Sequence, residues 1–276
     1  MTKPVLLFDI DNTLTPPRRP LNREMAEVLK NLDYQFHVAA GSHYGILESQ
    51  FFQPLADFGF KGKFHAFINN GARHCSFDYT DGLEMDVISD FDIRSHLGDD
   101  NFMFLLDVLH RAEQSPEFRI EPPLRIVGDT IGLRGSMVNF VPIGRKKGER
   151  DDEDYREARE MFVEFDERTG YRLRLLEHLN AELAELMTSR DLTITLGGET
   201  SFDLSIRNKD KSNAVWSLLE MGAERIIFLG DALFENGNDA TIQRVADTWP
   251  ADSDCPLETI QVRGWENTME VLRQLR

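Results

Sequence analysis

Hydrophobic runs alternate with helical patterns in the first and last parts of the chain. Residues 5–8 form a short apolar run, a helical pattern follows over residues 22–32, and residues 36–40 form a second apolar run. A comparable unit returns near the end, with a helical pattern over residues 211–221 and an apolar run over 225–229. Short apolar runs joined by amphipathic helices are typical of parallel strands with crossover helices. These parts therefore predict an α/β fold with a parallel sheet.

The middle of the chain follows a different pattern. Alternating segments over residues 124–127, 130–133 and 137–141 predict short strands, and residues 192–196 return to strand alternation. Two charged amphipathic helices lie between them, and apolar residues at helical spacing over 155–165 predict a helix packed on a core. We therefore predict an inserted α/β domain. The predicted domains are a core of residues 1–81 and 206–276 and an insert of residues 82–205.

Composition narrows the class of protein. The chain has 276 residues, of which 41% are hydrophobic and 29% charged, enough for a full core. We find neither an apolar run near the roughly 18 residues of a membrane span nor a basic region with an apolar signal segment at the start. We expect a cytoplasmic protein without membrane contact. The net charge of −17 also opposes non-specific nucleic-acid binding, which needs a basic surface.

Cysteine is scarce. The two cysteines, Cys75 and Cys255, cannot form a disulfide framework or a cysteine-based zinc site. His74 precedes Cys75, but adjacent residues of an extended segment point to opposite faces. We therefore interpret both cysteines as ordinary thiols.

Polar residues follow several of the predicted strands. Asp9 and Asp11 come directly after the first apolar run, in the sequence Asp-Ile-Asp-Asn-Thr. Alone, such residues are also common turn formers. Three further elements follow in a compatible order, and ligands of open α/β sheets bind at the carboxyl ends of the strands. These elements are Gly41-Ser42 after the second strand, Lys211 at a helix start, and Gly230-Asp231 with Gly237-Asn238-Asp239 downstream.

This combination resembles the haloacid-dehalogenase superfamily, whose first motif is Asp-x-Asp-x-Thr. The resemblance implies that Asp9 is a nucleophile that forms an aspartyl-phosphate and that Asp11 is a general acid and base. A carboxylate nucleophile divides one difficult displacement into two easier ones. The resemblance also implies Mg²⁺ bound by Asp9, the Asp11 carbonyl and Asp231.

The remaining motif residues take supporting roles by the same resemblance. Ser42 and Lys211 hold phosphoryl oxygens. Asn238 and Asp239 support the metal from the second shell, although Asp239 also suits a helix cap and Asn238 a turn. A solvated helix start remains the alternative for Lys211.

The insert points to a narrower group. The stretch from Arg134 through Asn139 to Arg145 and the segment Gly197-Gly198-Glu-Thr-Ser201-Phe-Asp203 resemble the cap of the eukaryotic-type phosphomannomutases, a cap of the C2b type. The resemblance makes Arg134 and Arg145 a clamp for a distal phosphate, since arginine binds phosphate bidentately. Ser201 and Asp203 bind that phosphate or sugar hydroxyls, unless they are plain strand residues of the cap. Arg18 also stands where the family has an arginine.

The family implies a reaction and its cofactors. We expect mannose 6-phosphate and mannose 1-phosphate to be interconverted through a hexose 1,6-bisphosphate, which acts as activator alongside Mg²⁺. The partner is thus a small sugar phosphate, and the resemblance suggests a homodimer formed by the caps. The alternative is a sugar-phosphate phosphatase of the same superfamily, with water as acceptor. A non-catalytic sugar-phosphate sensor is disfavoured because Asp9 and Asp11 are both present.

Five positions depart from the family pattern. Asn12 replaces a glycine, which asparagine can do because it tolerates left-handed backbone. Ala232-Leu233 replaces a Lys-Thr pair, and Glu199 replaces a glutamine. Val127 stands at an arginine position, with Arg125 two residues away. These departures bear on the substrate and the mutase activity more than on phosphoryl transfer.

Overall fold

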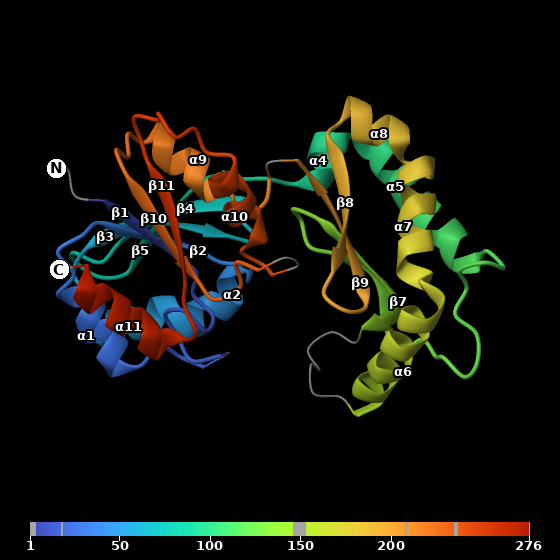
Figure 1. Cartoon of the computed structure of the whole chain (residues 1–276), viewed down its shortest axis with the longest axis horizontal. Helices are drawn as coiled ribbons and strands as arrows, with labels where there is room; N and C mark the ends of the chain where they lie inside the picture. Colours follow the sequence, from blue (N-terminus) through green and yellow to red (C-terminus); the bar gives the residue numbers. More distant parts are fainter. Residues whose placement is uncertain (1–3, 18, 146–152, 208, 235–236, 276) are drawn as a thin grey trace. The chain divides into compact units, whose positions relative to one another are not determined.

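The computed structural model describes residues 4–275 except 18, 146–152, 208 and 235–236. The chain divides into two compact units (Figure 1). The first unit combines Met1–Asp90 with Asn208–Arg276, and the second is the continuous segment Phe91–Arg207. We call them the core unit and the cap unit.

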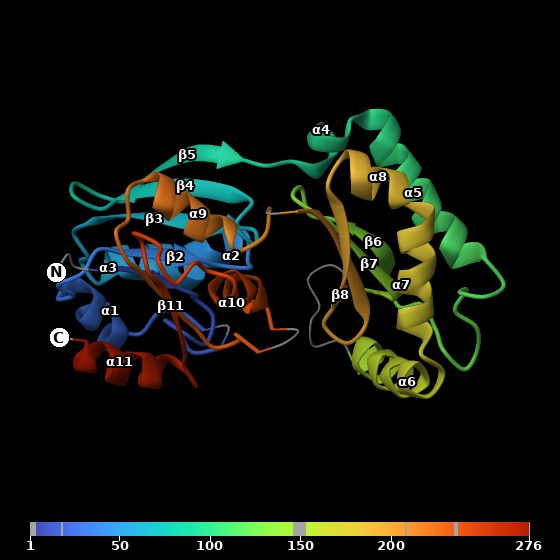
Figure 2. The same ribbon diagram turned by 45° about the horizontal axis from the view of Figure 1, so that its top comes forward.

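A seven-stranded sheet forms the centre of the core unit, in the order β11-β10-β1-β2-β3-β4-β5. The strands from β11 to β3 are parallel, whereas β3, β4 and β5 form antiparallel pairs that extend the sheet to its β5 edge (Figure 2). The parallel part explains the short apolar runs, because strands covered on both faces need apolar side chains on both. The strands are β1 Val5–Phe8, β2 Phe36–Ala39, β3 Lys63–Ile68, β4 Arg73–Asp78, β5 Glu84–Asp90, β10 Ile226–Gly230 and β11 Leu257–Gln261.

Helices cover both faces of this sheet. Leu6 and Phe8 of β1 belong to the apolar cluster that includes α1 and α11, which lie side by side in both views (Figures 1 and 2). Leu7 points to the other face and packs with residues of α9 and α10. Side chains that alternate along β1 thus pack into two apolar clusters, one on each face of the sheet. The helices are α1 Arg23–Lys30, α2 Tyr44–Leu47, the π-helical turn η1 Glu48–Phe52, α3 Gln53–Asp57, α9 Asn213–Glu220, α10 Ala240–Asp247 and α11 Trp265–Gln274.

The cap unit is an antiparallel sheet with helices on one face. Its strands follow the order β6-β7-β9-β8, and one apolar cluster joins β7, β8 and β9 to α5, α6 and α7. Among the described residues, no helix is both long and apolar enough to cross a membrane. The elements are α4 Ile93–Leu97, α5 Asp99–Gln114, β6 Asp129–Leu133, β7 Val138–Arg145, α6 Glu153–Thr169, α7 Tyr171–Glu182, α8 Ala184–Ser189, β8 Leu192–Gly197 and β9 Ser201–Ile206.

Most expected elements are present, with two differences. The predicted strand over residues 124–127 is wrong: Leu124 N–H donates to the Glu121 carbonyl and closes a turn. Two prolines, which lack N–H donors, precede it. The other difference concerns the start of the insert, which we placed at residue 82. Strand β5 pairs with β4 in the core sheet, so the chain leaves the core unit only after residue 90.

Candidate active site

Parallel pairing brings the predicted motifs to one edge of the core sheet. Phe8 at the end of β1 lies opposite Leu229 of β10, and the backbone N–H of Asp9 donates to the Leu229 carbonyl at 2.9 Å. Asp9 and Asp231 therefore leave neighbouring strands together. On its other side, β1 pairs with β2 through Phe8 and Val38, so Ser42 follows β2 at the same edge.

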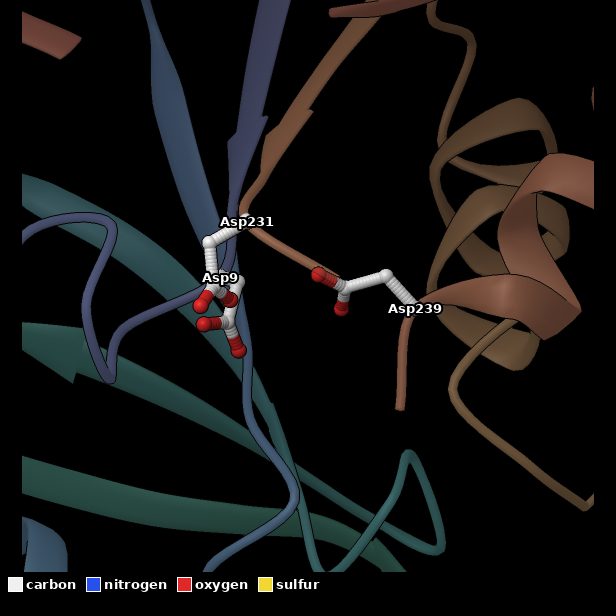
Figure 3. Close-up of side chains that lie close together, drawn as sticks. All are labelled: Asp9, Asp231 and Asp239. Carbon is white, nitrogen blue, oxygen red and sulfur yellow. The ribbon is translucent and has the colours of Figure 1, made fainter. Parts of the chain in front are cut away.

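Three aspartates and a lysine form the centre of this edge. Carboxylate oxygens of Asp9, Asp231 and Asp239 lie within 4.8 Å of one another, and their side chains converge from the ends of two strands and the start of α10 (Figure 3). The Lys211 ammonium donates to Asp9 Oδ1 and to Asp239 Oδ1. Asp239 Oδ2 accepts from the Ala232 N–H at 3.2 Å. Lys211 is thus a buried ion-pair partner rather than a solvated helix start.

Gly230 leaves room for this cluster. A Cβ atom at this position would lie 2.3 Å from Asp239 Oδ2. Any larger residue would have to displace the carboxylate that pairs with Lys211. The glycine that precedes Asp231 is therefore part of how the cluster is packed.

Burial and like charge act together on the cluster. Burial raises the pKa of Asp9 to about 7; Lys211 lowers it, whereas the charges of Asp239 and Asp231 raise it further. For Lys211, burial lowers the pKa, but the carboxylates of Asp9 and Asp239 outweigh this effect and raise it. The pKa of Asp231 is raised chiefly by burial. One ammonium thus faces three carboxylates, an arrangement that favours a further cation.

The donor set fits a hard divalent cation. Asp9 Oδ2 is buried and makes no hydrogen bond to any described residue. A buried carboxylate oxygen without a partner is costly, and a metal ion would satisfy it. The nearby ligand atoms of the cluster are oxygens, the ligands that Mg²⁺ prefers.

Asn12 contributes to the cluster in a way that the sequence did not reveal. Its backbone has a φ of +62°, which agrees with our interpretation that asparagine here tolerates left-handed backbone. Its side-chain Nδ2 also donates to Asp231 Oδ2 at 2.8 Å. The residue that replaces the family's glycine therefore orients a candidate metal ligand.

Asp11 lies beside the cluster and is held by a residue that the sequence analysis missed. Gln50 Nε2 donates to Asp11 Oδ1 at 3.0 Å and to Thr15 Oγ1 at 2.9 Å. Ser42, half-buried, accepts the Asn69 N–H at its carbonyl. Asn238 is exposed, and its amide lies 3.9 Å from where a Cβ of Gly41 would be. Arg18, the remaining predicted residue of this unit, lies outside the described residues.

The second group of predicted residues forms a polar network on the cap sheet. Asn139 lies opposite Asp203 and donates to its Oδ1 at 2.6 Å, while Arg134 Nη2 donates to Asn139 Oδ1 at 2.9 Å. Burial raises the pKa of Asp203, and the Asn139 hydrogen bond and the charges of Arg134 and Arg145 lower it. Both arginines therefore act on one carboxylate. We call Arg134, Asn139, Arg145 and Asp203 the cap arginine cluster.

Arg145 is oriented by an aromatic residue. Its Nη2 donates to the Tyr155 hydroxyl at 2.9 Å, and its guanidinium carbon lies 5.3 Å from the centre of the Tyr155 ring. That hydroxyl is also 3.3 Å from Thr200 Oγ1. The helical pattern predicted Tyr155 as a core residue, and it is buried, but it also holds this arginine. The Ser201 hydroxyl donates a hydrogen bond to the Gly197 carbonyl at 2.5 Å.

The family-specific departures have partners of their own. Arg125 pairs with Glu157 at 2.6 Å and with Asp154 at 3.5 Å, both on α6. Val127 packs against the cap core. Glu199 pairs with Arg159. Arg125 therefore forms ion pairs with the surface of α6. It does not take the place of the arginine that the family has at the position of Val127.

Comparison with known proteins decides the family. A model of the eukaryotic phosphomannomutases matches residues 25–263. The chain belongs to the eukaryotic phosphomannomutase family. Phosphomannomutase 2 of Dictyostelium discoideum is 29% identical over 242 residues, 86% of each protein. The phosphomannomutase of Arabidopsis thaliana is 28% identical over 242 residues, also 86% of each. Asp9 and Asp11 precede the residues that the family model matches.

Solved structures agree in fold. An IMP-nucleotidase of Plasmodium falciparum superposes with a TM-score of 0.59 at 12% identity, covering 99% of this chain and 68% of that one. A haloacid dehalogenase-like hydrolase from Bacteroides thetaiotaomicron superposes over all of both chains, with a TM-score of 0.52 and 11% identity. The predicted fold class, a Rossmann-like haloacid-dehalogenase core with an inserted α/β cap, is confirmed.

Proposed function

We propose that this member of the phosphomannomutase family interconverts mannose 6-phosphate and mannose 1-phosphate through an aspartyl-phosphate on Asp9. The observation that carries the proposal is the environment of Asp9. This carboxylate is buried at a strand end, paired with Lys211 and close to Asp231 and Asp239. Such an arrangement suits a nucleophile that must approach a phosphate dianion, because cations offset the repulsion between the two.

The chemistry divides into two transfers. The sugar oxygen leaves phosphorus as an oxygen of Asp9 bonds to it, and Asp11 gives its proton to the departing oxygen. In the reverse transfer, Asp11 takes the proton of a sugar hydroxyl as that oxygen attacks phospho-Asp9. A hexose 1,6-bisphosphate is the intermediate, and it serves as activator because it phosphorylates Asp9 at the start.

We propose Mg²⁺ as the cation, held by Asp9, the Asp11 carbonyl and Asp231. When bound, it neutralises charge on the transferring phosphoryl group. Lys211 orients Asp9 and compensates its charge, and Ser42 binds phosphoryl oxygens. Asn238 and Asp239 support the site, the latter by holding Lys211 in place. Arg18 is proposed as a sugar-phosphate ligand from its sequence position alone.

The cap arginine cluster is proposed to bind the second phosphate of the bisphosphate, with Ser201 beside it. Arg134 and Arg145 make the hydrogen bonds described above to a neutral amide and a neutral hydroxyl. These hydrogen bonds orient the two guanidinium groups, and an oriented guanidinium suits a phosphate clamp because it can bind phosphate bidentately. In a chain with 48 acidic residues, such a concentration of positive charge supports an anion site.

Phosphorus NMR tests the function directly. The purified protein is incubated with mannose 1-phosphate, Mg²⁺ and a trace of hexose 1,6-bisphosphate. We expect mannose 6-phosphate to form faster than inorganic phosphate. If only inorganic phosphate accumulates, the chain is a phosphatase. In parallel, mass spectrometry at acidic pH should place a phosphoryl group on the peptide that contains Asp9, and Asp9→Asn should remove it. A phosphoryl group on serine or histidine would contradict the nucleophile.

A further inference from the structure

A buried glutamine on a π-helical turn supports Asp11. Gln50 is 7% exposed and lies within η1. Gln50, Phe51 and Phe52 are consecutive and all buried, which the wide π-helical turn makes possible. The two phenylalanines pack into the core, whereas the glutamine directs its amide at Asp11 and Thr15. A polar side chain is thus placed in an apolar layer with its donors aimed at the candidate acid and base.

The neighbours of the amide determine its orientation. Thr15 donates its hydroxyl hydrogen to the Ile10 carbonyl at 3.2 Å, so its oxygen can only accept from Gln50. Asp11 Oδ1 likewise accepts. Both partners therefore require the NH₂ end of the amide, and a rotated amide would set its oxygen against a carboxylate. The hydrogen bonds to Asp11 and Thr15 therefore define the same orientation of the Gln50 amide.

The backbone around Gln50 is held as well. Its carbonyl accepts the Leu21 N–H at 2.7 Å, so η1 is tied to the segment that follows the Asp-x-Asp-x-Thr motif. Asp11 and Thr15 themselves form an isolated parallel bridge. The loop that carries Asp11 and the turn that carries Gln50 are therefore fixed to each other through backbone and side chain.

We propose that Gln50 is a positioning residue for proton transfer by Asp11. This inference rests on the proposed function of Asp11 as acid and base. The amide holds Oδ1 of Asp11, which fixes the plane of the carboxyl group that exchanges a proton with the sugar oxygen. In the transfer to Asp9, the bond from phosphorus to the sugar oxygen breaks, the bond to Asp9 forms, and the proton of Asp11 moves to the sugar oxygen. Gln50 is unchanged throughout.

Leaving-group dependence separates this role from a packing role. Mannose 1-phosphate needs a proton on its leaving oxygen, whereas p-nitrophenyl phosphate releases a stable phenolate that does not. Both are assayed with the full-length protein and Mg²⁺ in single turnovers, following the first transfer from each ester to Asp9, because the later transfer from phospho-Asp9 needs Asp11 as base for either substrate. Gln50→Met keeps the length of the side chain and removes the donor. We expect its single-turnover rate with mannose 1-phosphate to fall at least tenfold, with the Kd for this ester and the single-turnover rate of p-nitrophenol release within about twofold of wild type, since general acid catalysis is worth roughly 10²–10⁴-fold.

Three variants complete the design. Asp11→Asn should give the same split with a larger loss, and Gln53→Met, on an exposed glutamine of the next turn, should change neither substrate. Gln50→Glu keeps the shape of the side chain but sets a carboxylate against Asp11, and should show the split even if Gln50→Met does not fold. Equal losses on both substrates, no loss, or failure of both Gln50 variants to fold would make Gln50 a packing residue and overturn the proposal.

The outcomes also separate this proposal from the proposed function. A wild-type protein that transforms no sugar phosphate contradicts the function. An Asp11→Asn variant without the split contradicts the role of Asp11. A split in Asp11→Asn that is missing from Gln50→Met contradicts the role of Gln50 alone. Because a phosphatase also needs to protonate its leaving group, the test remains valid if the mutase assignment is wrong.

Discussion

At the scale of single residues, the charge of the Asp9 cluster has consequences for metal binding. Asp231→Asn removes one of the three neighbouring carboxylates and keeps an oxygen for the Asn12 hydrogen bond. We expect weaker Mg²⁺ binding, measured as a higher Mg²⁺ concentration at half-maximal activity. In wild type, Mg²⁺ at 100 times its Kd should stabilise the fold by about 2.7 kcal/mol, visible as a rise in Tm that the variant shows only at higher Mg²⁺.

The matched control is Asp252→Asn, which removes an exposed carboxylate of the same unit. Its activity and its Mg²⁺-dependent rise in Tm should equal those of wild type. Full activity of the wild-type protein in excess chelator would contradict the proposed metal site, and so would an unchanged Mg²⁺ titration in Asp231→Asn.

A second prediction at this scale concerns the distal phosphate. Arg145→Ala removes one guanidinium of the cap arginine cluster. Because a hydrogen bond to a charged group is worth about 2–3 kcal/mol, we expect mutase kcat/KM to fall roughly 30-fold to 150-fold. Release of inorganic phosphate per turnover should rise as the bisphosphate escapes. Arg125→Ala, whose guanidinium pairs with Glu157 on α6, is the control and should keep both activities. Equal effects of the two variants would contradict a phosphate clamp.

At the scale of secondary-structure elements, neighbouring strands of the core sheet carry a cluster of histidines. His65 N–H on β3 donates to His37 Nδ1 on β2 at 2.9 Å, and His65 Nδ1 lies 2.9 Å from His74 Nε2 on β4. Burial lowers the pKa of His37 to about 3 and that of His74 to about 4, with neighbouring histidines acting in the same direction. The folded core unit therefore contains neutral histidines.

This cluster predicts loss of stability in acid. The unfolded chain protonates these histidines near their ordinary pKa of 6.5, whereas the folded chain resists protonation until about pH 4 and 3. The unfolded state thus binds more protons over this window, so stability is complete above pH 6.5 and falls as pH falls. For His37 alone we expect a loss of about 2 kcal/mol between pH 7 and pH 5. Urea unfolding at both values measures it.

His37→Asn is the informative variant, since asparagine can still accept the His65 N–H but does not titrate. Its unfolding free energy should fall by about 2 kcal/mol less than that of wild type between pH 7 and pH 5. Gln53→Met changes an exposed glutamine of the core unit that carries no titratable group, and should leave the wild-type pH dependence unaltered. If His37→Asn and wild type lose equal stability in acid, the cluster does not titrate as we describe.

The same scale explains what could be predicted from the sequence. The strand ends that carry Asp9 and Asp231 were predictable, because apolar runs mark buried parallel strands and parallel strands end at a common edge. The strand over residues 124–127 was not, because apolar residues that pack a loop onto a core give the same local pattern as a strand. Strand β5 was assigned to the insert. Its residues are mostly exposed, so little in its pattern ties it to the core sheet.

Side-chain partners were harder to predict than positions. Gln50 lies 39 residues from Asp11 in the sequence, and their contact depends on a π-helical turn that has no pattern of its own. Asn12 was recognised for its backbone, but its bond to Asp231 spans 219 positions. Tyr155 was correctly predicted as buried, yet burial says nothing about where a hydroxyl points. Such contacts follow from packing in three dimensions, which periodicity does not encode.

At the scale of the whole molecule, we propose a homodimer through the cap unit. Strand β6 is an edge strand of the cap sheet, and Leu133 at its end is 60% exposed. An edge strand with exposed apolar residues is suited to self-association. Light scattering should give twice 31.7 kDa for wild type and 31.7 kDa for Leu133→Lys.

Leu173→Lys is the control, because Leu173 is 59% exposed but lies on α7. This variant should remain a dimer. A wild-type protein that stays monomeric at every concentration would contradict the dimer, and dissociation of both variants would contradict the role of β6.

The order of the elements along the chain also has a consequence for biosynthesis. Strand β1 pairs with β10, and Asp9 lies 202 positions before Lys211. At roughly 5 to 20 residues per second, a ribosome needs about 10 to 40 s to travel from one to the other. The continuous segment Phe91–Arg207 can fold during this interval, but β1 has no partner on one side. Until β10 has been synthesised, the edge of β1 that pairs with it stays unpaired in the nascent chain. A chain that is released before that point cannot assemble the aspartate cluster.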